Sequence, residues 1–124
     1  MRSGRIKIDG KEHVLCFSVR VVRNCAERYG EVNGLYRALS DKDQVKSLDE
    51  SLWILEQMMA AGAKYAKEKG IPNEDPLTMD QLYDTCGFDD LAGIRASVML
   101  TINSGKTTNV EAESSPNAEA TQGS

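Results

Sequence analysis

The sequence predicts a mostly helical α+β protein, in which one N-terminal β-hairpin packs on a small bundle of four to five helices. An Asp-Gly turn separates two short runs of β-forming residues within 5–17. Apolar residues then recur at helical spacing, and several of these stretches begin at recognisable caps. The 124 residues suffice for one domain with a modest core. We therefore expect one domain over 1–104 and a disordered acidic tail over 105–124.

The hairpin is predicted from the segment RIKIDGKEHVLCF, in which Asp9 and Gly10 both adopt positive φ at low cost. This turn sets the register, so residues 5–8 lie opposite residues 14–11 in antiparallel order. One face of the hairpin then collects mainly apolar side chains, and the other is mostly charged with Val14 as an apolar exception. Because an isolated hairpin is only marginally stable, the apolar face must pack on the helices. This face carries Ile6, Ile8, His13, Leu15 and Phe17.

The helices are predicted from caps and apolar spacing. Ser18 is expected to start a helix that stops at Gly30, and a short helix or turn covers 32–39. The longest helix is expected from about residue 43 or 48 to 69, with a capping box between Ser47 and Glu50.

Two further helices are expected after the loop at 70–76. Thr78 and Gln81 form a T-x-x-Q capping box, and Leu77 with Leu82 forms the accompanying hydrophobic staple. The last helix starts at Asp89 or Asp90. Its apolar face carries Leu91, Ile94, Val98 and Ile102.

The longest predicted helix carries two apolar rows, which is a wider stripe than one packing partner normally needs. Either the helix is central and buried on two sides, or one row packs in the domain and the other binds a neighbouring subunit or partner. The first row runs through Val45, Leu48, Leu52, Leu55, Met59, Gly62 and Ala66. The second row and two arginines of the preceding helix are the candidate protein-binding residues. They are Ile54, Met58, Ala61, Tyr65, Arg20 and Arg23.

The charge is unevenly distributed along the chain. Residues 1–28 contain seven Lys and Arg and three Asp and Glu, which gives a formal charge of +4. Because the net charge of the whole chain is −4, residues 29–124 carry a formal charge of −8. The acidic total does not favour a general nucleic-acid role. A basic front and an acidic back suit head-to-tail association of copies, or orientation on a charged partner, although an ordinary solvated surface gives the same pattern.

The residues that carry chemistry form no recognisable catalytic or metal-binding pattern. Three cysteines without C-x-x-C spacing do not favour a disulfide framework or a zinc knuckle, and the single His13 lies on the opposite strand face from Cys16. We find no phosphate loop, nucleophile elbow or dinucleotide motif, and therefore expect no catalytic residue, no metal and no cofactor. With neither a signal peptide nor a membrane-length apolar run, we expect a location in the cytoplasm.

The order of these segments resembles a known family. A hairpin IKIDGKEHVLCFS precedes a helix ending in ERYG, then come a long helix DESLWILEQMMAAGAKYAKEKG, a segment PLTMDQLYD and a helix IRASVMLTINSGK. Over residues 5 to about 106 this is similar to the tail assembly chaperones of long-tailed, siphovirus-type phages and prophages of Gram-positive bacteria. The most similar features are the x-I-x-I-x-G-K-E hairpin, the helix ending in Tyr-Gly and the W-x-L…A-G-A-x-Y helix.

The resemblance implies a function by binding and contributes no catalytic residue. Proteins of this family coat the tape measure protein, keep it soluble and assist tail-tube subunits to polymerise around it in the host cytoplasm. They are absent from the finished virion. A ribosomal frameshift commonly adds a second, extended form, and Gly105-Lys106 is a dipeptide that slippery codons could encode. The implied partners are the tape measure protein, the tail tube protein and further copies of the chain.

Two rival functions remain from the residues alone. The helices at 18–39 could act as a helix-turn-helix in a DNA-binding regulator, with Arg20, Arg23 and Arg28 on phosphates. A thiol enzyme built on Cys25 or Cys86 is the other. Salt-dependent DNA binding and thiol alkylation discriminate these rivals from a protein-binding module.

Overall fold

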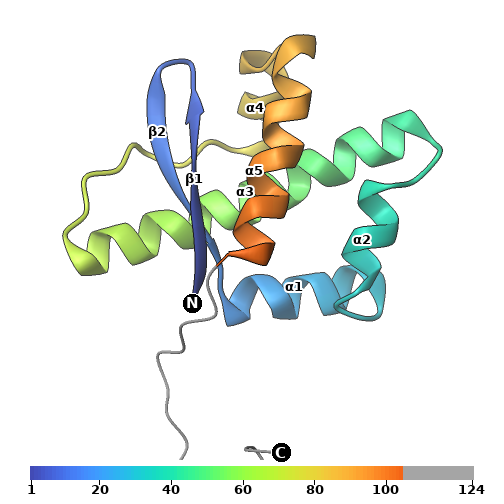
Figure 1. Ribbon diagram of the computed structural model, residues 1–124, viewed down its shortest axis with the longest axis horizontal. Helices are drawn as coiled ribbons and strands as arrows, with labels where there is room; N and C mark the ends of the chain where they lie inside the picture. The colour runs from blue at the N-terminus through green and yellow to red at the C-terminus, as the bar shows by residue number, and fades with distance from the viewer. Residues whose placement is uncertain (105–124) are drawn as a thin grey trace, which may run out of the picture.

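The computed structural model describes residues 1–104, which fold into an N-terminal β-hairpin and five α-helices (Figure 1). The predicted fold class is therefore confirmed, whereas the predicted disordered tail at 105–124 lies outside the described residues. The elements are β1 (Arg2–Ile8), β2 (Lys11–Phe17), α1 (Val19–Tyr29), α2 (Gly34–Leu39), α3 (Gln44–Lys69), α4 (Met79–Thr85), a 3-10 turn η1 (Phe88–Asp90) and α5 (Leu91–Asn103).

The hairpin has the predicted turn and register. Asp9 and Gly10 both have positive φ, at 51° and 78°, and β1 pairs antiparallel to β2 with Ile6 opposite His13. The face described above as mostly charged is not exposed along the whole of β2, because Val14 and Cys16 are 5% and 0% exposed and pack with Ala66 in the second half of α3. Both faces of β2 are therefore covered, while β1 alternates between exposed and buried positions.

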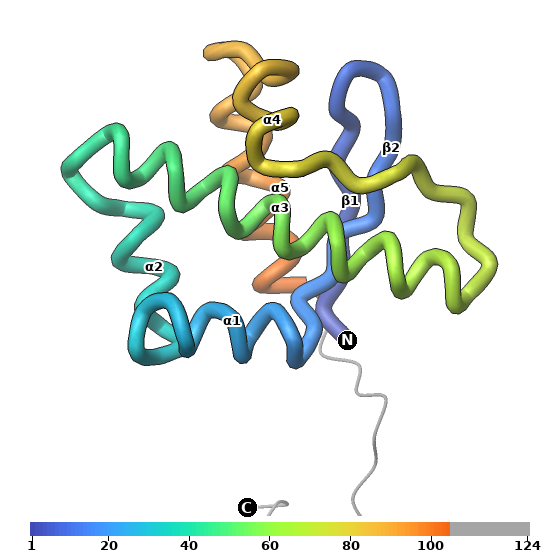
Figure 2. Tube along the Cα trace, turned by 180° about the vertical axis from the view of Figure 1, so that it is seen from behind, coloured from blue at the N-terminus to red at the C-terminus, as the bar shows by residue number. Residues whose placement is uncertain are grey.

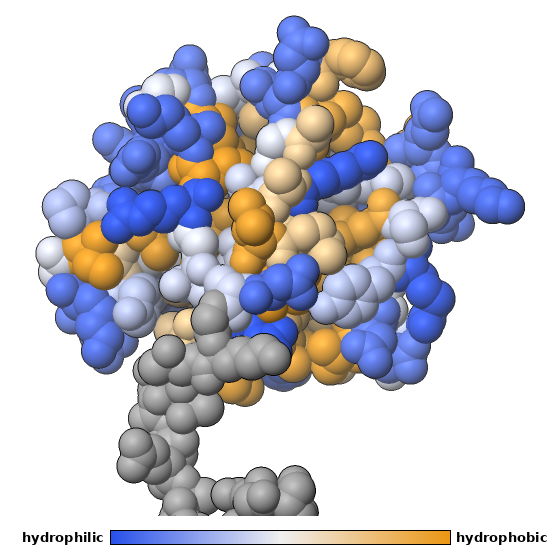
Figure 3. All heavy atoms as spheres, in the orientation of Figure 1, coloured by the Kyte–Doolittle hydropathy of each residue, from blue (hydrophilic) through white to orange (hydrophobic). Residues whose placement is uncertain are grey.

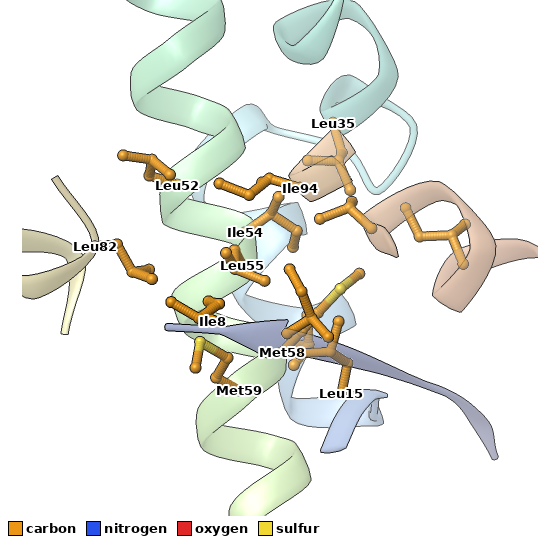
Figure 4. Close-up of a cluster of buried hydrophobic side chains, with 14 of the residues drawn as sticks. Ile8, Leu15, Leu35, Leu52, Ile54, Leu55, Met58, Met59, Leu82 and Ile94 are labelled. Atoms are coloured by element: carbon orange, nitrogen blue, oxygen red, sulfur yellow. The ribbon is translucent and has the colours of Figure 1, made fainter. Parts of the chain in front are cut away.

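Helix α3 is the centre of the domain. It crosses the hairpin, α2 and α5, as the two opposite views show (Figures 1 and 2). Gly62 allows the closest approach, because a Cβ there would overlap the backbone of Val14 and Leu15 in β2. Figure 4 shows side chains of α3 pointing towards the hairpin, α4 and α5 in one core.

Both apolar rows of α3 contribute to this core over its first half. Ile54 and Met58, predicted as partner-binding residues, are 0% exposed and pack with Leu15 and Ile94 of other elements. These two residues are therefore not the exposed binding surface that was predicted, because the core formed with the hairpin, α2 and α5 covers their side chains. A partner could reach them only if the domain opened.

The local caps are mostly as predicted. Ser18 accepts a hydrogen bond from Val21 N at 3.4 Å, and Thr78 and Gln81 exchange the two bonds of a capping box, at 3.2 and 2.8 Å.

The capping box predicted for Ser47 and Glu50 is wrong. Helix α3 begins one turn earlier, because Asp43 accepts the first-turn hydrogen bond from Val45 N at 3.0 Å. Ser47 instead donates its hydroxyl to the carbonyl of Leu39 at 2.7 Å and so fastens α3 to the end of α2. Among residues 1–104, no helix has the length and apolar composition needed to cross a membrane.

Candidate protein-binding groove

A hollow of about 340 Å³ lies between the start of α1 and the second half of α3. In the view from behind, the start of α1 comes near the middle of α3, and the two helices diverge towards α2 (Figure 2). The chain enters the groove directly from β2, where Ser18 caps α1 and sets the direction of its first turn. The hollow is lined by Met1, Ser18, Val19, Arg20, Val21, Gln57, Ala60, Ala61, Lys64, Tyr65 and Glu68.

The floor and one wall of this groove are apolar. Val19, the first residue of α1, is 84% exposed, so most of its side chain has no cover from residues 1–104. Ala61 and Tyr65 stand four residues apart on α3, which places them on one side of the helix. Both are half-buried against the small cluster around Val14 and Cys16, so their positions are fixed from below.

The rim of the groove is charged with both signs. Arg20 stands on the α1 side, and Lys64 and Glu68 stand one helical turn apart on the α3 side. An apolar floor between charged rims can hold the apolar face of a helix while the rim charges orient it.

The structure therefore divides the six predicted binding residues. Arg20, Ala61 and Tyr65 meet at the groove, although they come from different helices. Arg23 does not line it, and its guanidinium pairs with Glu27 one turn along α1 at 3.0 Å. Ile54 and Met58 belong to the core, as described above.

Sequence reasoning missed Val19 and Lys64 as groove residues. The sequence did carry a signal for Val19, because this residue is apolar although it does not belong to the buried positions of α1, which are Val21 and Cys25. An apolar residue outside the buried face of an amphipathic helix is a candidate for a contact beyond the helix's own core only where, as here, it stands beside other apolar side chains. Lys64 had no such signal, since its place at the groove depends on how α1 meets α3.

A second, more apolar hollow of about 270 Å³ lies between α2, α3 and α5. Arg95 stands at its edge and donates from its guanidinium to Ser47 Oγ at 3.1 Å. The sequence did not indicate this hollow, because three helices distant in the chain build it. Its lining residues are Tyr36, Leu39, Ser40, Ser51, Arg95, Val98 and Met99.

The three cysteines and the single histidine have pKa values shifted towards their neutral forms. Burial raises the pKa of Cys25 to about 11 and also raises the pKa of Cys16. The pKa of Cys86 is raised by burial and then by the nearby Asp90 carboxylate. Burial lowers the pKa of His13, against a smaller opposing effect of Glu74. Protonated thiols are poor nucleophiles.

Within residues 1–104, no three His, Cys, Asp or Glu side chains cluster as metal ligands.

The arginines proposed for DNA contact are mostly engaged with carboxylates. Arg28 forms a two-point pair with Glu50, at 2.7 and 3.0 Å, and its guanidinium lies 4.5 Å from the centre of the Trp53 ring. Arg23 is paired with Glu27. Neutralised arginines are less suited to phosphate contact than free ones, so the geometry gives the helix-turn-helix hypothesis little support.

Three comparisons with known proteins give no assignment. No protein-family model matches the chain, and searches of curated proteins and of solved structures find no similar chain.

Proposed function

We propose that this chain acts without catalysis, by binding an amphipathic helical segment of another protein in the groove between α1 and α3. Following the sequence resemblance, the proposed role is that of a phage tail assembly chaperone. Its main partner is then the tape measure protein, with the tail tube protein, further copies of the chain and a frameshift-extended form as additional partners.

The observation that supports this proposal most is the exposed side chain of Val19 beside the half-buried Tyr65 and Ala61. Three apolar side chains converge there from two helices, and Arg20 and Lys64 stand at the rim. An amphipathic helix can place one large apolar residue between them and a carboxylate beside each cation. Unlike Ile54 and Met58, which precede Ala61 and Tyr65 in the same row, these side chains are accessible without opening the fold of residues 1–104.

Chaperoning a long helical protein requires only modest affinity at each site. A tape measure chain offers repeated helical segments, so several copies can bind along one molecule and avidity strengthens the whole assembly. Weak individual sites also allow the copies to leave when tube subunits replace them. Head-to-tail contacts between copies would generate rings or an open spiral around such a chain, since heterologous contacts do not close into a dimer.

Substitution of Val19 by Asp tests the groove. Val19 is the first residue of α1, where a carboxylate favours the helix dipole, so Val19→Asp should fold normally. Val45→Asp is the matched control, because Val45 is 67% exposed in the first turn of α3 and lies outside the groove. Each variant is co-expressed with the tape measure protein of the same phage, and the soluble complex is measured by size-exclusion chromatography with light scattering.

We expect the wild-type chain and Val45→Asp to keep the tape measure protein in solution, and Val19→Asp to lose most of the complex. If all three chains carry the partner equally, the groove is not the binding site. If the wild-type chain leaves the tape measure protein insoluble, the chaperone role itself is refuted. Binding to duplex DNA that weakens steeply with added salt would instead support the regulator hypothesis.

A further inference from the structure

The two outer edges of the hairpin differ in how their backbone groups are used. In an antiparallel pair, alternate residues point their N–H and C=O groups outward, away from the partner strand. The bonds to neighbouring segments identify these residues: Val14 N donates to Asn73 Oδ1 at 2.8 Å, and Glu12 O accepts from Glu74 N at 3.3 Å. On β2, the outward groups are therefore engaged by the loop after α3.

The same alternation identifies the outward residues of β1. Ser3 N donates to Ser104 Oγ at 3.0 Å, so the outward series continues through Arg5 and Lys7. Among residues 1–104, no hydrogen bond engages the outward N–H and C=O groups of Arg5 and Lys7. This stretch of β1 is an open strand edge.

A hollow of about 490 Å³ lies along this open edge. Helix α5 touches β1 near Gly4, where Thr101 would meet an added Cβ, and the hollow opens further along the strand towards Asp9. Figure 3 shows hydrophilic side chains over the hairpin and hydrophobic surface between them and α5. The far wall consists of Thr85, Cys86, Asp89, Asp90, Gly93, Ile94 and Ser97.

We propose that this edge of β1 pairs with a short extended segment of a partner protein in which acidic residues alternate with small or apolar ones. The added strand would satisfy the outward N–H and C=O groups of Arg5 and Lys7 by the usual strand-to-strand bonds. This site is separate from the α1–α3 groove and does not depend on the function proposed for it.

The alternation follows from the two sides of the edge. Arg5 and Lys7 project from the exposed face of β1, where Arg5 also makes a solvent-exposed ion pair with Glu12 of β2 at 3.4 Å. A neighbouring strand places every second side chain beside these cations, where carboxylates are favoured. The other side chains of the added strand face α5. There Gly93 leaves open space, and Asp89 and Asp90 disfavour further carboxylates.

The same charges disfavour a second copy of β1 as the occupant. Antiparallel pairing of two β1 edges would place Arg5 and Lys7 of one copy against those of the other. Like charges directly opposite one another destabilise a strand pair. Basic residues on an edge thus protect against pairing between identical chains while leaving it open to an acidic segment.

The test uses the full chain and a synthetic, end-capped heptapeptide with Glu at positions two, four and six and Val, Ala or Thr between them. Amide hydrogen exchange is followed by NMR. We expect saturating peptide to slow exchange at Arg5 and Lys7 by about tenfold or more, as a bond worth about 1.4 kcal/mol would. The amides of Ile6 and Ile8, already within the β1–β2 ladder, should change little.

Two substitutions in α5 separate the site from a general effect. Gly93→Leu places a side chain in the hollow and should abolish the protection. Ala92→Leu is the matched control, because Ala92 is exposed on the same helix and does not line the hollow. A peptide with Lys in place of Glu should bind more weakly. The loss of one favourable cross-strand charge pair alone should weaken binding by about twofold to fivefold.

Several results would overturn the proposal. Unchanged exchange at Arg5 and Lys7 would show that the edge does not accept a strand, and equal binding of the Lys peptide would refute the charge argument. Protection without peptide that rises with protein concentration would identify a second copy as the occupant. Protection without peptide that is lost in Glu111→Lys/Glu113→Lys, but not in Glu119→Lys, would identify the chain's own acidic segment.

Discussion

Replacement of Gly62 by Ala probes the contact on which the arrangement of α3 and β2 depends. A Cβ at position 62 would lie 3.0 Å from Leu15 N and well inside contact distance of the carbonyl of Val14. These are backbone atoms of a strand that is covered on both faces, so they cannot rotate away as a side chain would. The helix must therefore move away from the strand, which loosens the packing of Cys16 and Ala66.

The magnitude follows from two opposing effects. Ala is favoured over Gly inside a helix by about 1 kcal/mol, whereas overpacking a well-packed core costs about 1 to 3 kcal/mol and occasionally more. Because the clash is with backbone, we place the cost of Gly62→Ala at the upper end, for a net loss of about 2 kcal/mol. In a domain of this size such a loss lowers Tm by about 8 to 16 °C.

Gly93→Ala supplies the control for this prediction. Gly93 also lies within a helix, but an added Cβ would meet nothing within 4 Å. This variant should therefore gain about 0.5 to 1 kcal/mol from helix propensity alone. Urea denaturation followed by circular dichroism and Trp53 fluorescence measures both free energies of unfolding. If Gly62→Ala is as stable as Gly93→Ala, the close approach of α3 to β2 is refuted.

Three further predictions concern the core and the buried titratable groups. Leu55→Ala should cost about 2 to 5 kcal/mol in urea unfolding, because Leu55 is 0% exposed; a loss below about 0.5 kcal/mol would place it at the surface. Burial lowers the folded pKa of His13 below 6.5, so the unfolded chain binds the proton more readily. Stability should therefore fall as the pH decreases below about 6.5, and His13→Gln should reduce this dependence between about pH 5 and 7. Cys25, with a pKa of about 11, should resist alkylation at neutral pH until urea unfolds the chain; rapid labelling of the native protein would revive the thiol-enzyme hypothesis.

The parts of the fold that sequence reasoning predicted are those specified within a few residues. The Asp9-Gly10 turn, the Ser18 cap and the Thr78 capping box each depend on partners no more than three positions away. Such interactions are visible in a single sequence because chain connectivity already brings the groups together.

The failures involve interactions between distant segments. Ser47 and Glu50 have capping-box spacing, but Ser47 donates to Leu39 and Glu50 pairs with Arg28, 22 residues away. Which face of the long helix is covered likewise depends on where α2 and α5 pack. The candidate site was accordingly predicted in part. Ala61 and Tyr65, on the α3 side of the groove, belong to the second apolar row that the sequence indicated. The same row also included Ile54 and Met58, which are buried in the core.

The groove and the open edge of β1 share an electrostatic feature that bears on the partners proposed for them. Arg20 and Lys64 border the groove, and Arg5 and Lys7 project beside the edge, although the chain carries a net charge of −4. At physiological salt, charges are screened beyond about 8 Å, so these cations act mainly on groups already in contact.

Selection at contact range differs physically from long-range attraction. A partner that places carboxylates beside these cations binds more tightly at both surfaces. A partner that places lysines there makes an unfavourable contact at either surface and binds more weakly. Added salt should weaken both interactions, yet it should leave the apolar contacts of Val19 and Tyr65 largely intact. The groove, which has an apolar floor, should therefore retain more of its affinity in high salt than the strand edge, where backbone bonds and charge act together.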